Sequence, residues 1–445
     1  MSDTSQAEQN DDTRPSLPKD LSFWGMTITQ FLGAFNDNLY KQLMLLLAIP
    51  VAVVATGAGA EEATSTSGSD IQGWATLVFS LPFVLFSGIA GYLSDKLSKQ
   101  PIIVACKVAE IVIMLLGLAA FYYYDLLGTT GTWIVLFLMG TQSAFFGPSK
   151  YGILPELFRK EDLPRANSLI LMTTFLAIIF GTVLAGQLKG SLVGEGGDFS
   201  SLWMGLLVCA GIAVAGTLTT LVIRRGTPAE PNMQLTADSW GVSKDVWEVL
   251  AKDRTLLAAL LVSSVFWLVS GLAVPTVNRL GLELLAVNDV QTSILTASIG
   301  FGIMIGAVFA SVLCRRGFGD QCVTIGLTGI FSALIALGIW SGSGNGPVHL
   351  LGYGGSIAGL IILGVFAAIF AIPIQVFLQS RPPKEVKGRM IATMNQANFI
   401  GILISGPLYQ VFEALAGNMN WPICSVFLMM SLLVLPLAAV YRLRS

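Results

Sequence analysis

Long apolar runs, separated by shorter polar stretches, dominate the chain. Each run holds about 20 residues rich in Leu, Ala, Ile and Gly, the length that a helix needs to cross ~30 Å of hydrocarbon. A membrane β-barrel would need shorter segments of alternating polarity, so helices are favoured. We expect twelve membrane-spanning helices, at residues 26–54, 72–93, 101–124, 131–155, 166–187, 201–223, 255–277, 290–314, 321–341, 353–379, 391–415 and 421–441.

Composition supports an all-α membrane protein. The 445 residues are 54% hydrophobic and only 12% charged, whereas soluble domains average about 25% charged residues. The five cysteines lack the paired spacing of a disulfide framework or a metal site. We therefore expect no metal and no cofactor.

Twelve spans place successive loops on alternate sides of the membrane, and the basic residues are distributed unequally between these two sides. The loops on one side hold only Lys189 and Arg279, and cytoplasmic loops are normally the richer ones in Lys and Arg. The richer side, which also carries Arg442 and Arg444, is thus predicted to be cytoplasmic, with both termini. Its loops hold Lys96, Lys99, Arg159, Lys160, Arg165, Arg224, Arg225, Lys244, Lys252, Arg254, Arg315, Arg316, Arg381, Lys384, Lys387 and Arg389.

The spans divide into two halves of six. Residues 1–20 lack apolar periodicity and are expected to form a disordered tail. Residues 21–223 form the first predicted bundle, 224–254 a cytoplasmic linker, and 255–445 the second bundle. A flexible spacer is expected at residues 57–70.

The linker contains one short amphipathic helix. Val246, Trp247 and Leu250 share one side of it, and charged residues occupy the rest. Such a helix can lie in the headgroup layer of the membrane. Docking against the bundles is the alternative.

The two halves resemble each other. Residues 140–165 and 364–389 each contain a Gly- and aromatic-bearing span, a proline (Pro148 or Pro373) and a charged loop that ends in Arg. Two parallel six-helix halves with a substrate site between them are the arrangement of major-facilitator transporters.

Charge in the first span is the strongest functional signal. Asn36, Asp37, Asn38 and Lys41 lie within an otherwise apolar run. A charge at mid-membrane costs roughly 2.5–3.5 kcal/mol, so such groups usually mark a substrate or ion path. Asp37 and Lys41 are four residues apart and can pair on one helix face.

Polar residues in other spans are candidates for the same path. Glu110 is expected either to line it or to pair with Lys107, three residues away. Lys107 itself is expected to extend toward the membrane surface, and Glu156 to pair with a basic loop residue. In the second half Gln375, Gln379, Asn395, Gln396 and Asn398 offer a neutral lining, or interhelical hydrogen bonds.

The loop at residues 91–99, GYLSDKLSK, resembles the major-facilitator signature after the second helix. That resemblance implies a latch between the halves, in which Asp95, with Lys96 and Lys99 in the same loop, contacts cationic groups or helix N-termini of the neighbouring half. We group Arg165 and Arg389, which end the matching loops, with these gating residues. The eighth span lacks the acid at the equivalent point.

The sequence FGPSKYGILPEL at residues 146–157 is the most distinctive stretch. With QFLGAFNDN at 30–38, RANSL at 165–169 and Phe266-Trp267, it resembles the bacterial lysophospholipid transporter branch of the major-facilitator superfamily. The resemblance implies movement of lysophospholipids, chiefly lysophosphatidylethanolamine, from the outer to the inner leaflet of the bacterial inner membrane. It also implies membrane lipids and a lysophospholipid acyltransferase as partners, a monomer and no nucleic-acid partner.

The residues suit that cargo. Lys150 offers a point charge for phosphate, and Asp37 offers a partner for an ammonium group. Tyr40, with Phe35, Phe145 and Phe146, can line the path of the acyl chain.

Other functions remain open. A proton-coupled exporter of drugs or small solutes would use Asp37 or Glu110 as its proton carrier. A membrane acyltransferase is disfavoured, because the only histidine, His349, has no acid at the expected spacing and is expected to be a solvated loop residue. No phosphate-binding GxxxxGK[ST] motif indicates direct ATP hydrolysis. A transporter relic that moves nothing is disfavoured by its buried charges, and we expect no enzyme.

Overall fold

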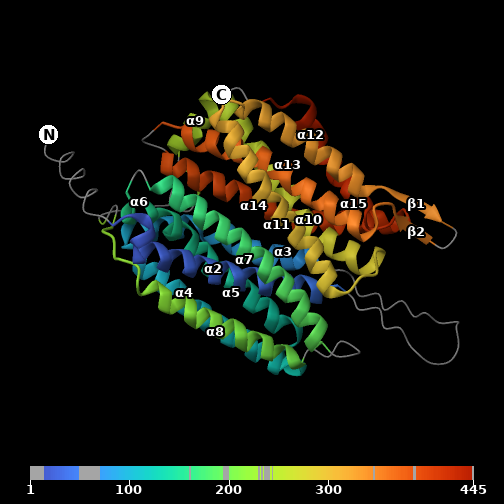
Figure 1. The fold of residues 1–445 in the computed structure, drawn as a ribbon, viewed down its shortest axis with the longest axis horizontal. Coiled ribbons are helices and arrows are strands. Elements are labelled where there is room, and N and C mark those ends of the chain that lie inside the picture. The colour runs from blue at the N-terminus through green and yellow to red at the C-terminus, as the bar shows by residue number, and fades with distance from the viewer. Residues whose placement is uncertain are drawn as a thin grey trace.

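The computed structural model describes residues 15–49, 71–159, 162–193, 200–228, 231, 234, 241–242, 244–343, 346–383 and 387–442. The expected outer spacer at 57–70 and most of the expected tail lie outside these residues. Long, roughly parallel helices form the body of the molecule (Figure 1).

Six long helices make up the first half. They are α2 (Leu21–Leu47), α3 (Gln72–Lys96), α4 (Lys99–Tyr122), α5 (Tyr124–Gly152), α7 (Leu163–Leu192) and α8 (Trp203–Thr220), with short turns at α6 (Leu154–Leu157) and η2 (Ser200–Leu202). Their apolar faces meet in a core that includes Leu39, Leu43, Met114, Leu136 and Leu206.

The second half has the same number of long helices among the residues described. They are α10 (Arg254–Arg279), α11 (Asp289–Arg315), α12 (Gly319–Gly338), α13 (Gly352–Ser380), α14 (Lys387–Asn418) and α15 (Ser425–Val440), with a π turn, η4 (Leu280–Leu284), after α10. The first half, coloured blue to green, lies below the second half, coloured yellow to red, in Figure 1.

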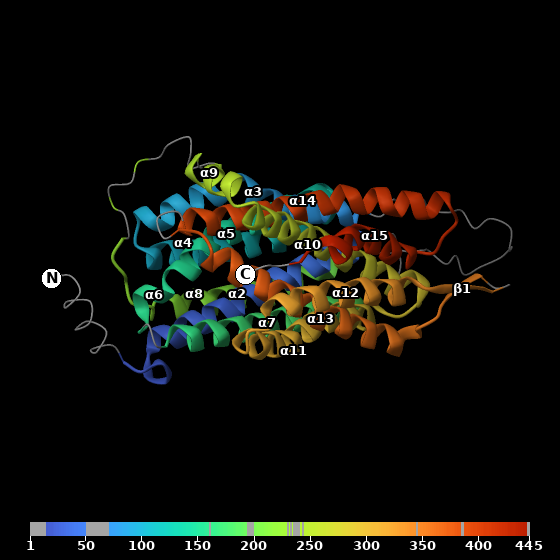
Figure 2. The ribbon, with the colours of Figure 1, turned by 90° about the horizontal axis from the view of Figure 1, so that it is seen from above.

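An antiparallel hairpin of β1 (Trp340–Ser343) and β2 (Gly346–His349) joins α12 to α13, with Trp340 opposite His349. It was not expected from the sequence. The hairpin lies at one end of the molecule, which we call the hairpin end; α6 and α9 (Lys244–Lys252) lie at the opposite linker end (Figure 2).

Nine of the described helices are long and apolar enough to cross a membrane: α3, α4, α7, α8, α10, α11, α12, α13 and α14. Helices α2 and α5 are long enough but more polar, and α15 has 16 residues. The protein is therefore an all-helical membrane protein apart from the hairpin.

The two halves meet along α3 with α14 and along α7 with α11. Glycines permit the closest approach: a Cβ on Gly73 would lie 2.3 Å from the carbonyl oxygen of Gly406, so the two backbones are in contact. Farther from the hairpin end, the rings of Phe83 and Phe399 stack with centroids 4.0 Å apart.

Helix α2 starts earlier than expected, and the reason is local. Leu17–Lys19 form a 3-10 turn with Leu17 buried, and the Asp20 carboxylate accepts from the Ser22 amide at 2.8 Å. Asp20 also pairs with Arg224 at 2.6 Å. The end of the expected disordered tail is thus packed against the first half, while residues 1–14 lie outside the description.

The linker helix α9 docks on the second half. Val246 and Leu250 are buried in that half's core, whereas Trp247 is exposed. The inner face of this helix is therefore docked against a bundle, as the alternative expectation for the linker helix had it.

His349 is not the solvated loop histidine that was expected. It is 4% exposed, its Nε2 lies 2.9 Å from the carbonyl oxygen of Leu337, and its Nδ1 lies 3.2 Å from Ser356 Oγ. The hairpin brings it back onto the second half, which the spacing of residues along the chain does not reveal.

Candidate substrate site

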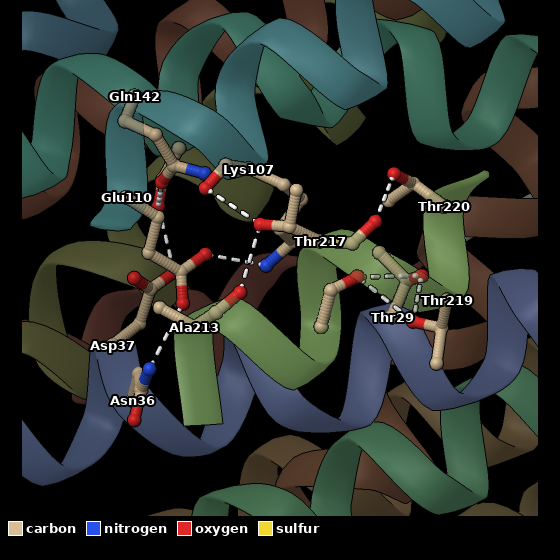
Figure 3. Close-up of polar contacts among 12 residues, drawn as sticks. Thr29, Asn36, Asp37, Lys107, Glu110, Gln142, Ala213, Thr217, Thr219 and Thr220 are labelled. Carbon is tan, nitrogen blue, oxygen red and sulfur yellow. Dashed lines mark hydrogen bonds and ion pairs between the residues drawn. The ribbon is translucent and has the colours of Figure 1, made fainter. Parts of the chain in front are cut away.

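Asp37 lies on the face of α2 that meets α5. Ser143 Oγ donates a hydrogen bond to Asp37 Oδ2 at 2.6 Å and contacts Gln142 Oε1 at 3.1 Å. The Asp37 side chain stays partly exposed. Figure 3 shows it beside Asn36, Glu110 and Gln142.

A buried ion pair lies next to Asp37. Lys107 Nζ is 2.5 Å from Glu110 Oε2, and the two residues are 1% and 2% exposed. Asn36 Nδ2 donates to Glu110 Oε1 and to the carbonyl oxygen of Cys209, both at 3.0 Å. The pairing of Glu110 with Lys107 is confirmed, but the extension of Lys107 toward the membrane surface was wrong, because the carboxylate holds its ammonium inside the bundle.

Gly33 makes room for that ammonium. A Cβ at this position would lie 2.0 Å from Lys107 Nζ. Neutral and charged partners thus converge on Glu110 from α2 and α4, as a buried carboxylate requires.

Lys150 lies near the same group of charges, on α5. Its Nζ is 4.4 Å from the ring centroid of Tyr151 and 5.9 Å from that of Phe146, and Lys107 Nζ is 5.0 Å from the Phe146 centroid. Two ammonium groups therefore share one aromatic neighbour, within the range of cation–π attraction.

Two further polar residues of α2, Lys41 and Asn38, take different positions. Lys41 Nζ lies over the Phe79 ring at 5.0 Å, and in the described structure Asp37 accepts from Ser143 rather than from Lys41. The expected Asp37–Lys41 pair is therefore replaced by two separate contacts. Asn38 is partly exposed and donates to the Ala34 carbonyl oxygen of its own helix at 2.8 Å.

Tyr40 does not line a path for the acyl chain. It is fully buried in the core of the first half, and its hydroxyl donates to the Thr132 carbonyl oxygen at 3.2 Å. Tyr40 follows Asp37 by three residues, so it lies only about 60° from Asp37 around α2, and its burial follows from packing against Thr132 of α5.

The second half presents Gln375 on α13 and Asn395 on α14, both exposed. Asn395 lies one helical turn from Phe399, whose ring stacks on Phe83 of α3, so this face of α14 is directed toward the first half. Asn398 instead is buried and accepts from Ser263 Oγ at 2.9 Å, which is the interhelical role considered for these residues.

The expected gating residues of the first half lie at the linker end. Asp95 is exposed in the last turn of α3, Lys96 donates to Tyr92 Oη at 2.7 Å, and Arg165 is exposed near the start of α7. Lys99 Nζ lies 2.5 Å from Glu156 Oε1, which confirms the expected pairing of Glu156 with a loop base.

Arg389 contacts the linker. Its guanidinium lies 2.5 Å from Asp245 Oδ2 of α9, and Arg381 lies 2.8 Å from Asp253 Oδ2 at the start of α10. These two ion pairs fasten the linker to the second half.

Ser143 and Lys107 are two residues beside Asp37 that the sequence did not assign to this site. Ser143 precedes Lys150 by seven residues, two helical turns, so the helical period alone would have put the two on one face of α5. Lys107 carried a signal in its spacing to Glu110, but its depth in the bundle depends on tertiary packing.

Known proteins resemble this chain along most of its length. The chain is 27% identical over 416 residues to the lysophospholipid transporter LplT of Enterobacter sp. (strain 638), covering 89% of this chain and 91% of the relative. It is 26% identical over 410 residues to LplT of Serratia proteamaculans (strain 568), covering 89% and 91%. The resemblance seen in the sequence motifs is thereby confirmed.

Solved transporters share the fold. The POT family transporter PepTSo superposes with a TM-score of 0.72 at 10% identity, covering 96% of this chain and 97% of that one. The nucleoside transporter NupG gives 0.66 at 13% identity, covering 95% and 98%. The family model of the Major Facilitator Superfamily matches residues 23–406, and the chain belongs to that superfamily.

Proposed function

We propose that this protein transports lysophospholipids, such as lysophosphatidylethanolamine, from the outer to the inner leaflet. The observation that carries the proposal is that Asp37 of α2 accepts a hydrogen bond from Ser143 of α5, the helix that also carries Lys150, in a chain that is similar to LplT transporters along its length. The Asp37 and Lys150 side chains are both partly exposed. They provide the anion and the cation that a zwitterionic headgroup needs.

Each charged residue then has a distinct role. Lys150 contacts the phosphate, as a flexible point charge suits, and Asp37 contacts the ammonium. The Lys107–Glu110 pair positions α2 against α4 and contributes to the field at Asp37. Lys41 and Asn38 extend the polar face, while Gln375 and Asn395 face the headgroup from the second half.

The proposed topology has twelve spans, with α2, α5 and α15 joining the nine helices that satisfy length and hydropathy. The linker end faces the cytoplasm of a bacterial inner membrane, because it carries the excess of Lys and Arg. Alternating movement of the two six-helix halves exposes the site to each leaflet in turn. An acyltransferase then consumes the delivered lipid.

A proton-coupled exporter is the second candidate. It is favoured by one observation: Asp37 Oδ1 is buried without a hydrogen-bond partner among the described residues, so it offers a place for a proton. In this alternative, Asp37→Asn abolishes dependence on the proton gradient. Glu110 is the weaker proton carrier, since Lys107 already neutralises it.

Reconstitution into liposomes tests the proposed cargo. Labelled lysophosphatidylethanolamine is placed in the outer leaflet, and protection from an external quencher is followed with time. Wild-type protein should protect the label, and Asp37→Ala or Lys150→Ala should slow this about 10-fold or more, because charge-assisted hydrogen bonds contribute about 1.5–3 kcal/mol.

Asp125→Ala and Lys252→Ala are matched controls, since both residues are exposed and lie at the ends of the molecule. Equal rates in the site variants and in these controls would remove Asp37 and Lys150 from the mechanism. Lack of protection by the wild-type protein would reject the cargo itself.

A further inference from the structure

A polar network joins the two halves near the hairpin end. Gln42 Nε2 of α2 donates to Asn278 Oδ1 of α10 at 2.7 Å, and Asn278 Nδ2 donates to Gln72 Oε1 of α3 at 3.0 Å. Thr296 Oγ1 of α11 donates to Asn278 Oδ1 at 2.9 Å. Asn278 thus links three helices to its own, and it is fully buried.

The surroundings of this network exclude water. Gln42 and Gln72 are 3% and 0% exposed. Gln72 also donates to the carbonyl oxygen of Pro275 at 3.3 Å. The backbone contact of Gly73 with Gly406 follows directly after Gln72 in α3.

A second contact closes the α7–α11 side of the same end. Lys189 Nζ lies 2.8 Å from Asp289 Oδ1, and a Cβ on Gly186 would lie 2.3 Å from Ser293 Oγ. The hairpin end is thus joined by hydrogen bonds, an ion pair and direct backbone packing on both sides of the interface between the halves.

The amide network differs from the ion pair in an important respect. Gln42, Gln72 and Asn278 are neutral, so separating them leaves no buried charge, whereas separating a buried ion pair does. Each amide can exchange its partner for water when the interface opens. A network of this kind can form and break repeatedly.

Helix α2 connects this network with the candidate site. Asp37 and Gln42 are five residues apart on α2, about 7.5 Å along the helix axis. A rigid movement of α2 that is coupled to occupancy at Asp37 must therefore displace Gln42 relative to Asn278.

We infer that Asn278, with Gln42 and Gln72, forms a charge-free lock that holds the hairpin end closed and opens to admit substrate from that side. The inference rests on the proposed alternating access. The lock residues are separate from the loop signature near Asp95, which lies at the linker end.

Accessibility of a buried cysteine tests the lock without any lipid substrate. Ser80 is 1% exposed and lies on the face of α3 between Gly73 and Phe83, both of which contact α14. A membrane-impermeant maleimide is applied from the hairpin side to protein carrying Ser80→Cys, and labelling above that of protein without this change is measured.

Asn278→Ala should raise the labelling rate about tenfold. Asn398→Ala is the matched control, because it removes a buried asparagine whose hydrogen bond with Ser263 stays within the second half; its labelling rate should not change. Gln42→Leu removes one arm of the lock and should act in the same direction if Asn278→Ala does not yield folded protein.

Crosslinking gives an independent test. Lys189→Cys with Asp289→Cys, joined by a short reagent that carries two maleimide groups, should hold the hairpin end shut and suppress labelling of Ser80→Cys in the Asn278→Ala protein. Unchanged labelling in folded Asn278→Ala and Gln42→Leu proteins would overturn the lock. Failure of the wild-type protein to move lysophospholipid would reject the proposed cargo, but labelling would still decide the lock.

Discussion

Lys107 Nζ and Glu110 Oε2 lie 2.5 Å apart inside the first half, where both side chains are almost completely buried. Their spacing of three residues brings them together on α4. Asn36 of α2 satisfies the other carboxylate oxygen, at 3.0 Å. Through Asn36, the pair on α4 is linked to α2, the helix that carries Asp37.

Removing one partner of the pair should destabilise the protein strongly. Glu110→Ala leaves the Lys107 ammonium buried without a counter-charge, a loss of about 3–5 kcal/mol. We expect a lower Tm in detergent by fluorescence or calorimetry. The double variant Lys107→Met with Glu110→Leu should recover most of the loss, and no recovery would show that the pair itself is not the source of the stability.

Gly33 should not tolerate a methyl group. Gly33→Ala places Cβ 2.0 Å from Lys107 Nζ, so the ion pair must shift. Gly147→Ala, within α5, meets no atom within 4 Å and should be neutral or stabilising by up to about 1 kcal/mol, since alanine favours helices. Equal Tm values for the two variants would contradict the packing described around Lys107.

Transport of lipids with different headgroups should distinguish the role of Lys150 from that of Asp37. Lys150→Gln should slow transport of all lysophospholipids, because each of them carries a phosphate. Asp37→Asn should slow lysophosphatidylethanolamine by about tenfold more than lysophosphatidylglycerol, because a charged hydrogen bond of about 1.5–3 kcal/mol is available only to the amine. Competition between the two lipids in the liposome assay measures this ratio, and a ratio unchanged from wild type would reject the assignment of Asp37 to the ammonium.

His349 should make stability depend on pH. Burial lowers the pKa of His349 below its ordinary value of 6.5, against the opposing hydrogen bond to the Leu337 carbonyl oxygen. The unfolded chain therefore binds a proton at higher pH than the folded one, so this contribution to stability is present above about pH 6.5 and is lost as pH falls.

Tm measured from pH 7.5 to 5.5 should thus decline in the wild-type protein. His349→Gln retains a donor for the Leu337 carbonyl oxygen and should flatten the decline, because the sequence contains only one histidine. An identical decline in both proteins would assign the effect to other groups.

The sequence anticipated the features that follow from periodicity and insertion energetics. Long apolar runs predicted the helices, and the charge within the first span pointed to Asp37. Spacing along one helix predicted the contact of Lys107 with Glu110. These features depend on one element at a time.

Features that depend on several elements were not predictable. Whether Lys107 reaches the surface or the interior depends on Gly33 of a different helix. Tyr40 and Asp37 belong to the same stretch of α2, yet packing against α5 buries one and leaves the other accessible. The network joins Asn278 to Gln42 and Gln72, each more than 200 positions away from it along the chain, and no single-helix pattern indicates it.

A structure determined with lysophosphatidylethanolamine bound tests the central claim most directly. The account predicts density for the headgroup between the halves, with a phosphate oxygen within hydrogen-bond distance of Lys150 Nζ and the amine within hydrogen-bond distance of the Asp37 carboxylate. A headgroup bound elsewhere, with Asp37 and Lys150 directed into surrounding lipid, would contradict it.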